Sequence, residues 1–252
     1  MSPFGLTVAI LIFTAVGWYF GLYRLKKYGS DGVVIRDSLA TAIFGLSALV
    51  LGFTFHGSVS KYTDRMQTIR IEAQTLQSVN SLITYLQPSD QLAVKKSLEN
   101  LLDTRLSAYI NITRLSDIDS EAEKITIAVR QVQEDVMRAT LNTSAENKTY
   151  ATNLLVPKVG NLVAVFESGT IDAKSHPPIL LMRFLIALLC IGAFLIGYTM
   201  VLKNETDWLL ASLYMLLIGL SLYVILSLEF PSLSMSYGEI NRDFLRLKDV
   251  MK

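Results

Sequence analysis

The chain has 252 residues, of which 51% are apolar and only 18% charged, and its formal net charge at pH 7 is +1. A near-neutral chain of this kind lacks the basic surface that a nucleic-acid-binding protein needs. Because there is one cysteine, Cys190, and only two histidines, His56 and His176, an intrachain disulfide is excluded and a metal or thiol enzyme is not expected.

Four apolar stretches are close to the roughly 20 residues that cross a membrane as a helix. Their only Asp, Glu, Lys or Arg residue is Arg183, and they comprise Pro3–Tyr23, Ser38–Ser60, Ile179–Leu202 and Trp208–Leu228. The first lacks the basic start and the small-residue cleavage site of a signal peptide, so we expect it to be retained. Four such runs exceed what one soluble domain of this length could bury. The sequence therefore predicts an all-α membrane protein with four transmembrane helices.

A polar segment, residues 61–177, separates the second and third stretches and is predicted to be a helical extramembrane domain. At its start, apolar residues recur every three or four positions, as in a coiled-coil seam with Asn80 as its one polar member. No Gly or Pro occurs between Ser58 and Gln87, so we expect the second membrane helix to continue through this seam without a break. The seam comprises Tyr62, Met66, Ile69, Ala73, Leu76 and Ile83.

Three further helices are predicted in this domain. The first begins at Asp90 and ends near Ile112, and the second is capped by Asp119 or Ser120. The third covers residues 147–167, where Pro157 should kink or split it. The predicted organisation is residues 1–60 for membrane helices one and two, 61–177 for the helical domain, 178–230 for membrane helices three and four, and 231–252 for a C-terminal tail.

Sequence motifs of catalysis are absent. The chain has no P-loop, no dinucleotide-binding glycine pattern, no zinc-protease motif and no nucleophile elbow. The spans carry almost no ionisable group, which disfavours a membrane hydrolase and proton-coupled transport. We expect neither an enzyme nor a cofactor.

Several short motifs are spread along the chain from about Ser38 to about Tyr237. They are Leu51-Gly52-Phe53, Arg65, Glu72-Ala73, the Leu86-x-Pro88 turn, Asp103-x-Arg105-Leu106, His176-Pro177-Pro178 and Glu229-Phe230-Pro231. Together they resemble the motifs of a bacterial bestrophin-like membrane family of unknown function. More distantly, the segment from Ala48 to Arg65 resembles the second membrane helix of the bestrophin anion channels, although the acidic calcium clasp of animal bestrophins has no counterpart here.

This resemblance implies four membrane helices, a cytoplasmic helical domain and a pentameric anion channel in the bacterial inner membrane. It also places the tiers of an apolar gate on Gly45, Leu49 and Phe53, of which only Phe53 supplies an aromatic ring. The conducted ion would be an inorganic anion such as chloride, and the surrounding partner is the lipid bilayer.

Gly45, Leu49, Phe53 and His56 recur every three or four residues and face one side of the second membrane helix. One interpretation is a pore wall in which Phe53 forms a hydrophobic constriction. The other is close packing between helices, since small residues are frequent on this helix. In the pore interpretation, the basic residues Lys61 and Arg65 lie at the mouth and attract anions.

Arg183 is the only charged residue well inside a span. Its side chain could extend to the interface, form an ion pair with Glu229 at the end of the fourth span, or attract anions. The sequence leaves these three roles open.

The leading functional hypothesis is an oligomeric, passive, anion-conducting channel whose second membrane helix lines the pore. The alternative is a non-conducting membrane scaffold or sensor whose helical domain recruits a partner. Basic residues in the first loop, Arg24, Lys26 and Lys27, argue that this loop is cytoplasmic. The basic C-terminal tail and the resemblance argue the opposite, so we expect both termini and the helical domain in the cytoplasm.

Overall fold

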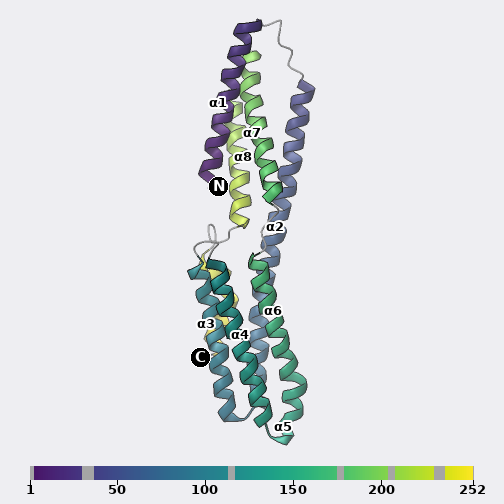
Figure 1. Ribbon diagram of the computed structural model, residues 1–252, viewed down its shortest axis with the longest axis vertical. Coiled ribbons are helices and arrows are strands. Elements are labelled where there is room, and N and C mark those ends of the chain that lie inside the picture. Colours follow the sequence, from purple (N-terminus) through teal and green to yellow (C-terminus); the bar gives the residue numbers. More distant parts are fainter. Residues whose placement is uncertain are drawn as a thin grey trace. The chain divides into compact units, whose positions relative to one another are not determined.

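The computed structural model describes residues 3–29, 37–112, 117–174, 179–203, 208–229 and 236–251, and every element in these ranges is helical. The helices form two compact units (Figure 1). Unit 1 comprises Met1–Tyr62 and His176–Ser234, and unit 2 comprises Thr63–Ser175 and Met235–Lys252.

Unit 1 contains α1 (Pro3–Tyr28), the first part of α2 (Asp37–Leu82), α7 (Ile179–Leu202) and α8 (Trp208–Glu229). Helices α1 and α7 lie side by side (Figure 1). Their contact is close because a Cβ added at Gly17 of α1 would meet the carbonyl oxygen of Phe194, and one added at Gly197 of α7 would meet that of Thr14. Glycines at such positions let two membrane helices approach through their backbones.

Helix α2 uses only a narrow stripe within unit 1. Its buried residues are Ser47, Val50, Thr54 and Ser58, spaced three or four apart. The hydroxyls of Ser47 and Thr54 donate to the carbonyl oxygens of Ile43 and Val50, each at 2.8 Å, so these buried polar groups are satisfied within the helix. The stripe leaves most of α2 in this unit uncovered by the other described helices.

Among the described residues, five helical segments are long and apolar enough to cross a membrane, one more than the sequence analysis expected. Four of them overlap the four predicted spans. The fifth, Ala145–Ile171, has a mean hydropathy of 1.2 and lies in unit 2. The sequence analysis placed this region in the helical extramembrane domain, residues 61–177.

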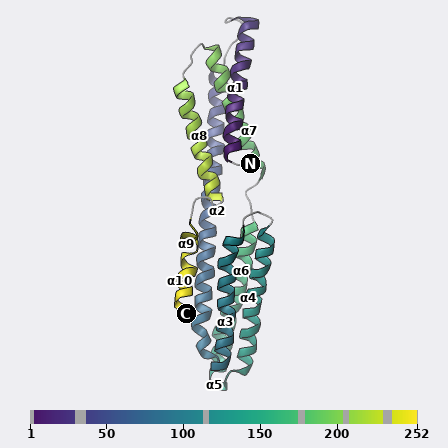
Figure 2. The ribbon, with the colours of Figure 1, turned by 90° about the vertical axis from the view of Figure 1, so that its left-hand side faces the viewer.

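Unit 2 is a helical bundle with a shared apolar core (Figure 2). Its largest fully buried side chains include Leu76 of α2, Leu98 and Leu101 of α3, and Phe166 and Phe244. Its elements are the remainder of α2, a 3-10 turn at Ile83–Tyr85, α3 (Pro88–Asn111), α4 (Asp117–Asn142), α5 (Ala145–Tyr150), a π-helical turn at Ala151–Leu155, α6 (Val156–Lys174), α9 (Tyr237–Ile240) and α10 (Arg242–Met251).

The prediction that the second membrane helix continues unbroken is confirmed, because α2 is a single helix of 46 residues. The seam residues Ile69, Ala73, Leu76 and Ile83 are buried, however, in the core of unit 2. Their apolar surface is therefore covered by helices of the same chain. The seam thus packs against other helices, as its period predicts, and at these four positions the partner helices belong to the same chain.

The start of α4 differs from the prediction, whereas the region around Pro157 agrees with it. Helix α4 begins at Asp117, so Asp119 and Ser120 lie in its first turn rather than at its cap; the hydroxyl of Ser120 donates to the carbonyl of Asp117 at 3.0 Å. Pro157 follows the π-helical turn, as expected for a residue that disturbs the regular helix, since proline has no backbone N–H to donate. His176-Pro177-Pro178 lies outside the described residues.

The C-terminal segment, expected as a tail, folds into α9 and α10 and belongs to unit 2. A capping box begins α9, in which the backbone N–H of Glu239 donates to the hydroxyl of Ser236 and the Glu239 carboxylate accepts from the backbone N–H of Ser236. Helix α10 is amphipathic and buries Phe244, Leu247 and Met251 in the core.

Candidate pore-lining surface and the ion pair of unit 2

The proposed pore residues project away from the rest of unit 1. Leu49 is 55% exposed and Phe53 is 63% exposed, and Gly45 and His56 are exposed as well. A Cβ placed at Gly45 would have no atom of the described chain within 4 Å. Large apolar side chains exposed in this way face lipid, another subunit or a pore.

The glycines of α2 do not serve close packing within the described chain. Positions Gly52 and Gly57, like Gly45, face open space, whereas Gly17 and Gly197 sit against the backbone of a neighbouring helix. Close packing in unit 1 is therefore made by α1 and α7. The signal that the sequence analysis missed is Gly17-x-x-x-Gly21, a spacing typical of membrane helices in close contact.

Lys61 lies on a different side of α2 from this row. At about 100° per residue, Leu49, Phe53 and His56 fall within about 80° of Gly45, whereas Lys61 falls about 160° away. Lys61 is half-buried rather than exposed. Arg65 belongs to unit 2, where it is half-buried and engaged by its surroundings. The structure thus does not gather Lys61 with the candidate pore residues.

Arg183 is exposed near the start of α7. The side chain of Glu229 lies outside the described residues, so the ion pair considered between them stays a prediction. Among the described residues, no group of three or more His, Cys, Asp or Glu side chains is arranged to hold a metal ion.

Among the ion pairs of the described residues, the most deeply buried lies in unit 2. Arg105 of α3 donates from Nε to Oε2 of Glu72 on α2 at 2.8 Å, and the two side chains are only 16% and 3% exposed. The Arg105 guanidinium also lies over the ring of Phe244, 5.4 Å from its centroid. Gly169 of α6 makes room for the carboxylate, since a Cβ there would collide with it. The pair joins helices α2, α3 and α10.

The sequence analysis did not predict that Glu72 is buried. A signal was present, because Glu72 and Arg105 belong to two of the motifs that carried the family resemblance. Periodicity alone could not show that these two motifs meet in space.

No family model and no curated protein matches this chain. Among solved structures, it is similar to a bacterial bestrophin homologue from Klebsiella pneumoniae, with a TM-score of 0.62 over 96% of this chain and 98% of that chain. The chain has the bestrophin fold. This finding confirms, at the level of the fold, the resemblance noted in the sequence.

The two chains share only 14% sequence identity. At that distance the agreement concerns how the helices are arranged and not which side chains they carry. The shared fold alone does not establish ion conduction, which depends on the side chains of this chain.

Proposed function

We propose that this chain is one subunit of an oligomeric, passive, anion-conducting channel whose α2 helices surround the pore. The observation that carries the proposal is the exposed row Gly45, Leu49, Phe53 and His56, which no other helix of the described chain covers. In a bestrophin fold, a second membrane helix with such an uncovered face is suited to line an axis between subunits.

Four spans, α1, the first part of α2, α7 and α8, cross the membrane in this proposal. The fifth candidate, Ala145–Ile171, stays outside because its apolar residues are already used. Ala151, Leu155, Leu162 and Phe166 are all buried in the core of unit 2. The remaining face carries charged groups such as Lys158, which would be costly in hydrocarbon.

The exposed row of α2 is suited to form a hydrophobic constriction. A ring of Leu49 and Phe53 side chains offers nothing to replace the hydration shell of an ion, so it blocks conduction when narrow. Between Ser38 and Ser60, α2 contains no Asp or Glu, so an anion on the axis would meet no ring of negative charge from this segment. This absence and the polar His56 support anions, chloride foremost, over cations.

The proposed assembly is a ring of five subunits in a bacterial inner membrane, with unit 2 and both termini in the cytoplasm. A closed cyclic ring presents the same face of each α2 to one axis. Arg183, exposed near the end of a span, contributes to attracting anions or extends to the interface. No enzymatic reaction is assigned to the chain.

Conductance in planar bilayers tests this proposal. Phe53→Ala widens the proposed constriction and should increase single-channel conductance or open probability. Phe55→Ala is the matched control, because Phe55 is exposed on the same helix but lies about 160° from Phe53. The proposal is contradicted if neither the wild-type protein nor Phe53→Ala conducts, or if the two variants change conductance alike.

A non-conducting scaffold is the second candidate. It is favoured by one observation, the exposure of Ile127 (62%) and Leu141 (75%) on α4 of unit 2. These two residues lie 14 positions apart and so share a face of the helix. A reconstituted protein that passes no ions but retains a stable partner through this face would support the scaffold.

A further inference from the structure

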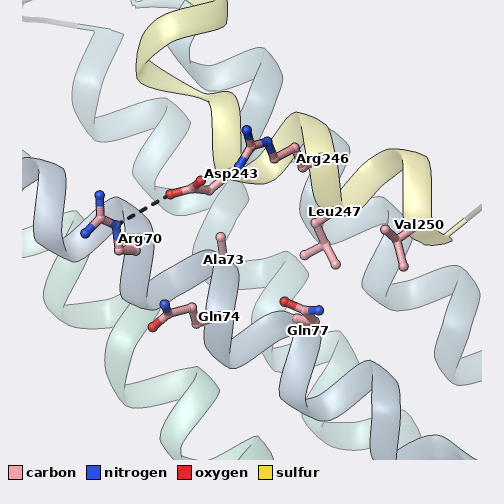
Figure 3. Close-up of a pocket in the computed structure, with 8 residues that line it drawn as sticks. All are labelled: Arg70, Ala73, Gln74, Gln77, Asp243, Arg246, Leu247 and Val250. Carbon is pink, nitrogen blue, oxygen red and sulfur yellow. Dashed lines mark ion pairs between the residues drawn. The ribbon is translucent and has the colours of Figure 1, made fainter.

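A pocket of about 340 Å³ opens in unit 2 between α2 and α10 (Figure 3). Helix α2 contributes Arg70, Ala73, Gln74 and Gln77, and α10 contributes Asp243, Arg246, Leu247 and Val250. The volume is near the lower end of the range found for small-molecule sites. None of these residues belongs to the candidate pore surface or to the Glu72–Arg105 pair.

Charge in the pocket is unbalanced. It has two guanidinium groups, Arg70 and Arg246, and one carboxylate, Asp243, which gives a net charge of +1. In Figure 3, Arg70 extends from α2 towards Asp243. The Nε of Arg70 lies 3.7 Å from the Asp243 carboxylate, which is longer than a hydrogen bond, and the Arg70 side chain is 66% exposed. The guanidinium of Arg70 therefore keeps donors available to a ligand.

The remaining lining is divided between apolar and amide groups. Ala73, Leu247 and Val250 provide aliphatic surface, while Gln74 and Gln77 provide donors and acceptors on the α2 side. A ligand suited to this lining carries one negative charge and a short hydrocarbon part. A phosphate dianion suits it less well, because Asp243 would repel its second charge.

We propose that this pocket binds a small monocarboxylate with a short aliphatic chain. The carboxylate accepts hydrogen bonds from Arg246 and Arg70, and the aliphatic part lies against Leu247 and Val250. Arginine is well suited to this role, since its planar group can donate two parallel hydrogen bonds to one carboxylate. The site is independent of whether the chain conducts ions.

Saturation-transfer NMR with butyrate, on the full chain in nanodiscs, tests the proposal. The wild-type protein should bind butyrate at millimolar concentration and should bind the neutral butyramide much more weakly. Arg246→Gln should weaken butyrate binding about tenfold, the value of roughly one charge-assisted hydrogen bond. Arg138→Gln is the matched control, because Arg138 is 72% exposed on α4 and pairs with Asp135 of the same helix.

Asp243→Asn provides the opposite change. It removes the competing carboxylate, raises the pocket charge to +2, and should tighten butyrate binding several-fold, a gain that misfolding cannot produce. The proposal is overturned if butyrate and butyramide bind equally, if Arg246→Gln and Arg138→Gln behave alike, or if Asp243→Asn fails to tighten binding.

Discussion

At the residue scale, Glu72 shows how a charged side chain can be part of a core. Its carboxylate is 3% exposed and is stabilised by a hydrogen bond from Arg105, which also packs on Phe244. Removing water from a charge is costly, and a close, directed partner offsets the cost. The intact pair is therefore expected to contribute little net stability. Removing one partner should nevertheless destabilise the fold strongly, because it leaves the other charge buried without compensation.

Arg105→Met should destabilise unit 2 by about 3 kcal/mol, because it leaves the Glu72 carboxylate buried without this partner. The thermal unfolding midpoint, followed by circular dichroism, should fall by roughly 10 °C. Adding Glu72→Gln should recover part of the loss, since the second change removes the buried charge. Arg138→Met, at an exposed ion pair, should change stability by no more than about 0.5 kcal/mol. Equal effects of Arg105→Met and Arg138→Met would contradict the role assigned to the buried pair.

In the proposed channel, ion selectivity depends on which individual side chains of α2 face the ions. His56 lies on the exposed row of α2, whereas Lys61 lies about 160° from Gly45. We therefore expect His56→Glu to reduce the anion-to-cation permeability ratio strongly, and Lys61→Glu to reduce it less. Reversal potentials in asymmetric salt give both ratios. A larger effect of Lys61→Glu would show that the other side of α2 faces the ions.

At the element scale, unit 1 combines one tight helix pair with one sparsely covered helix. Helices α1 and α7 meet through glycines, with Gly21 also close to Val201 and the carbonyl of Tyr198. Helix α2 joins the same unit through a stripe that includes Val50 and through Phe44, whose ring meets that of Tyr214 edge-on at 5.7 Å. Helix α2 therefore keeps a wide uncovered face that a pore or another subunit can use.

Gly17→Ala should separate α1 from α7, because the added Cβ meets the carbonyl oxygen of Phe194 and backbone cannot move aside easily. We expect a loss of about 2 kcal/mol, as for other overpacked sites, measured as a lower thermal midpoint of the detergent-solubilised protein. Gly219→Ala on α8 is the matched control, since a Cβ there meets open space. If the two variants are equally stable, the close contact between α1 and α7 does not limit stability.

At the scale of the whole molecule, the two units differ in what covers them. Unit 2 has a continuous core of leucine, valine and phenylalanine side chains drawn from α2, α3, α4, α6 and α10. Unit 1 exposes many large apolar side chains, including Leu11, Tyr19, Leu180, Leu209 and Leu216. An exposed apolar surface of this extent is expected where lipid or further subunits replace water.

Sidedness can be measured with single cysteines in a Cys190→Ala background. Ser144→Cys, at an exposed position of unit 2, should resist an impermeant maleimide on intact cells and react after permeabilisation. Ser30→Cys, between the first two spans in the sequence, should react on intact cells. The reverse pattern would place unit 2 outside the cytoplasm and favour the orientation indicated by Arg24, Lys26 and Lys27.

Local patterns in the sequence were sufficient to predict the helical class, the four apolar stretches that overlap helices of unit 1, and the unbroken course of α2. These features depend on hydrophobicity, on period and on the absence of Gly and Pro, all of which are local properties of the chain. The motif resemblance also predicted the bestrophin fold that the structural comparison confirms.

Which face of each helix packs against which neighbour became visible only in the tertiary structure. It buried the row from Ile69 to Ile83 within the chain, turned Glu72 inward to Arg105, and brought α10 against α2 to form the pocket at Arg246. It also placed the close helix contact on Gly17 and Gly197 and left Gly45 open. The spacing of apolar or small residues along the sequence shows that a helix has an apolar or a small-residue face. Which helix packs against that face depends on contacts between residues far apart in the sequence.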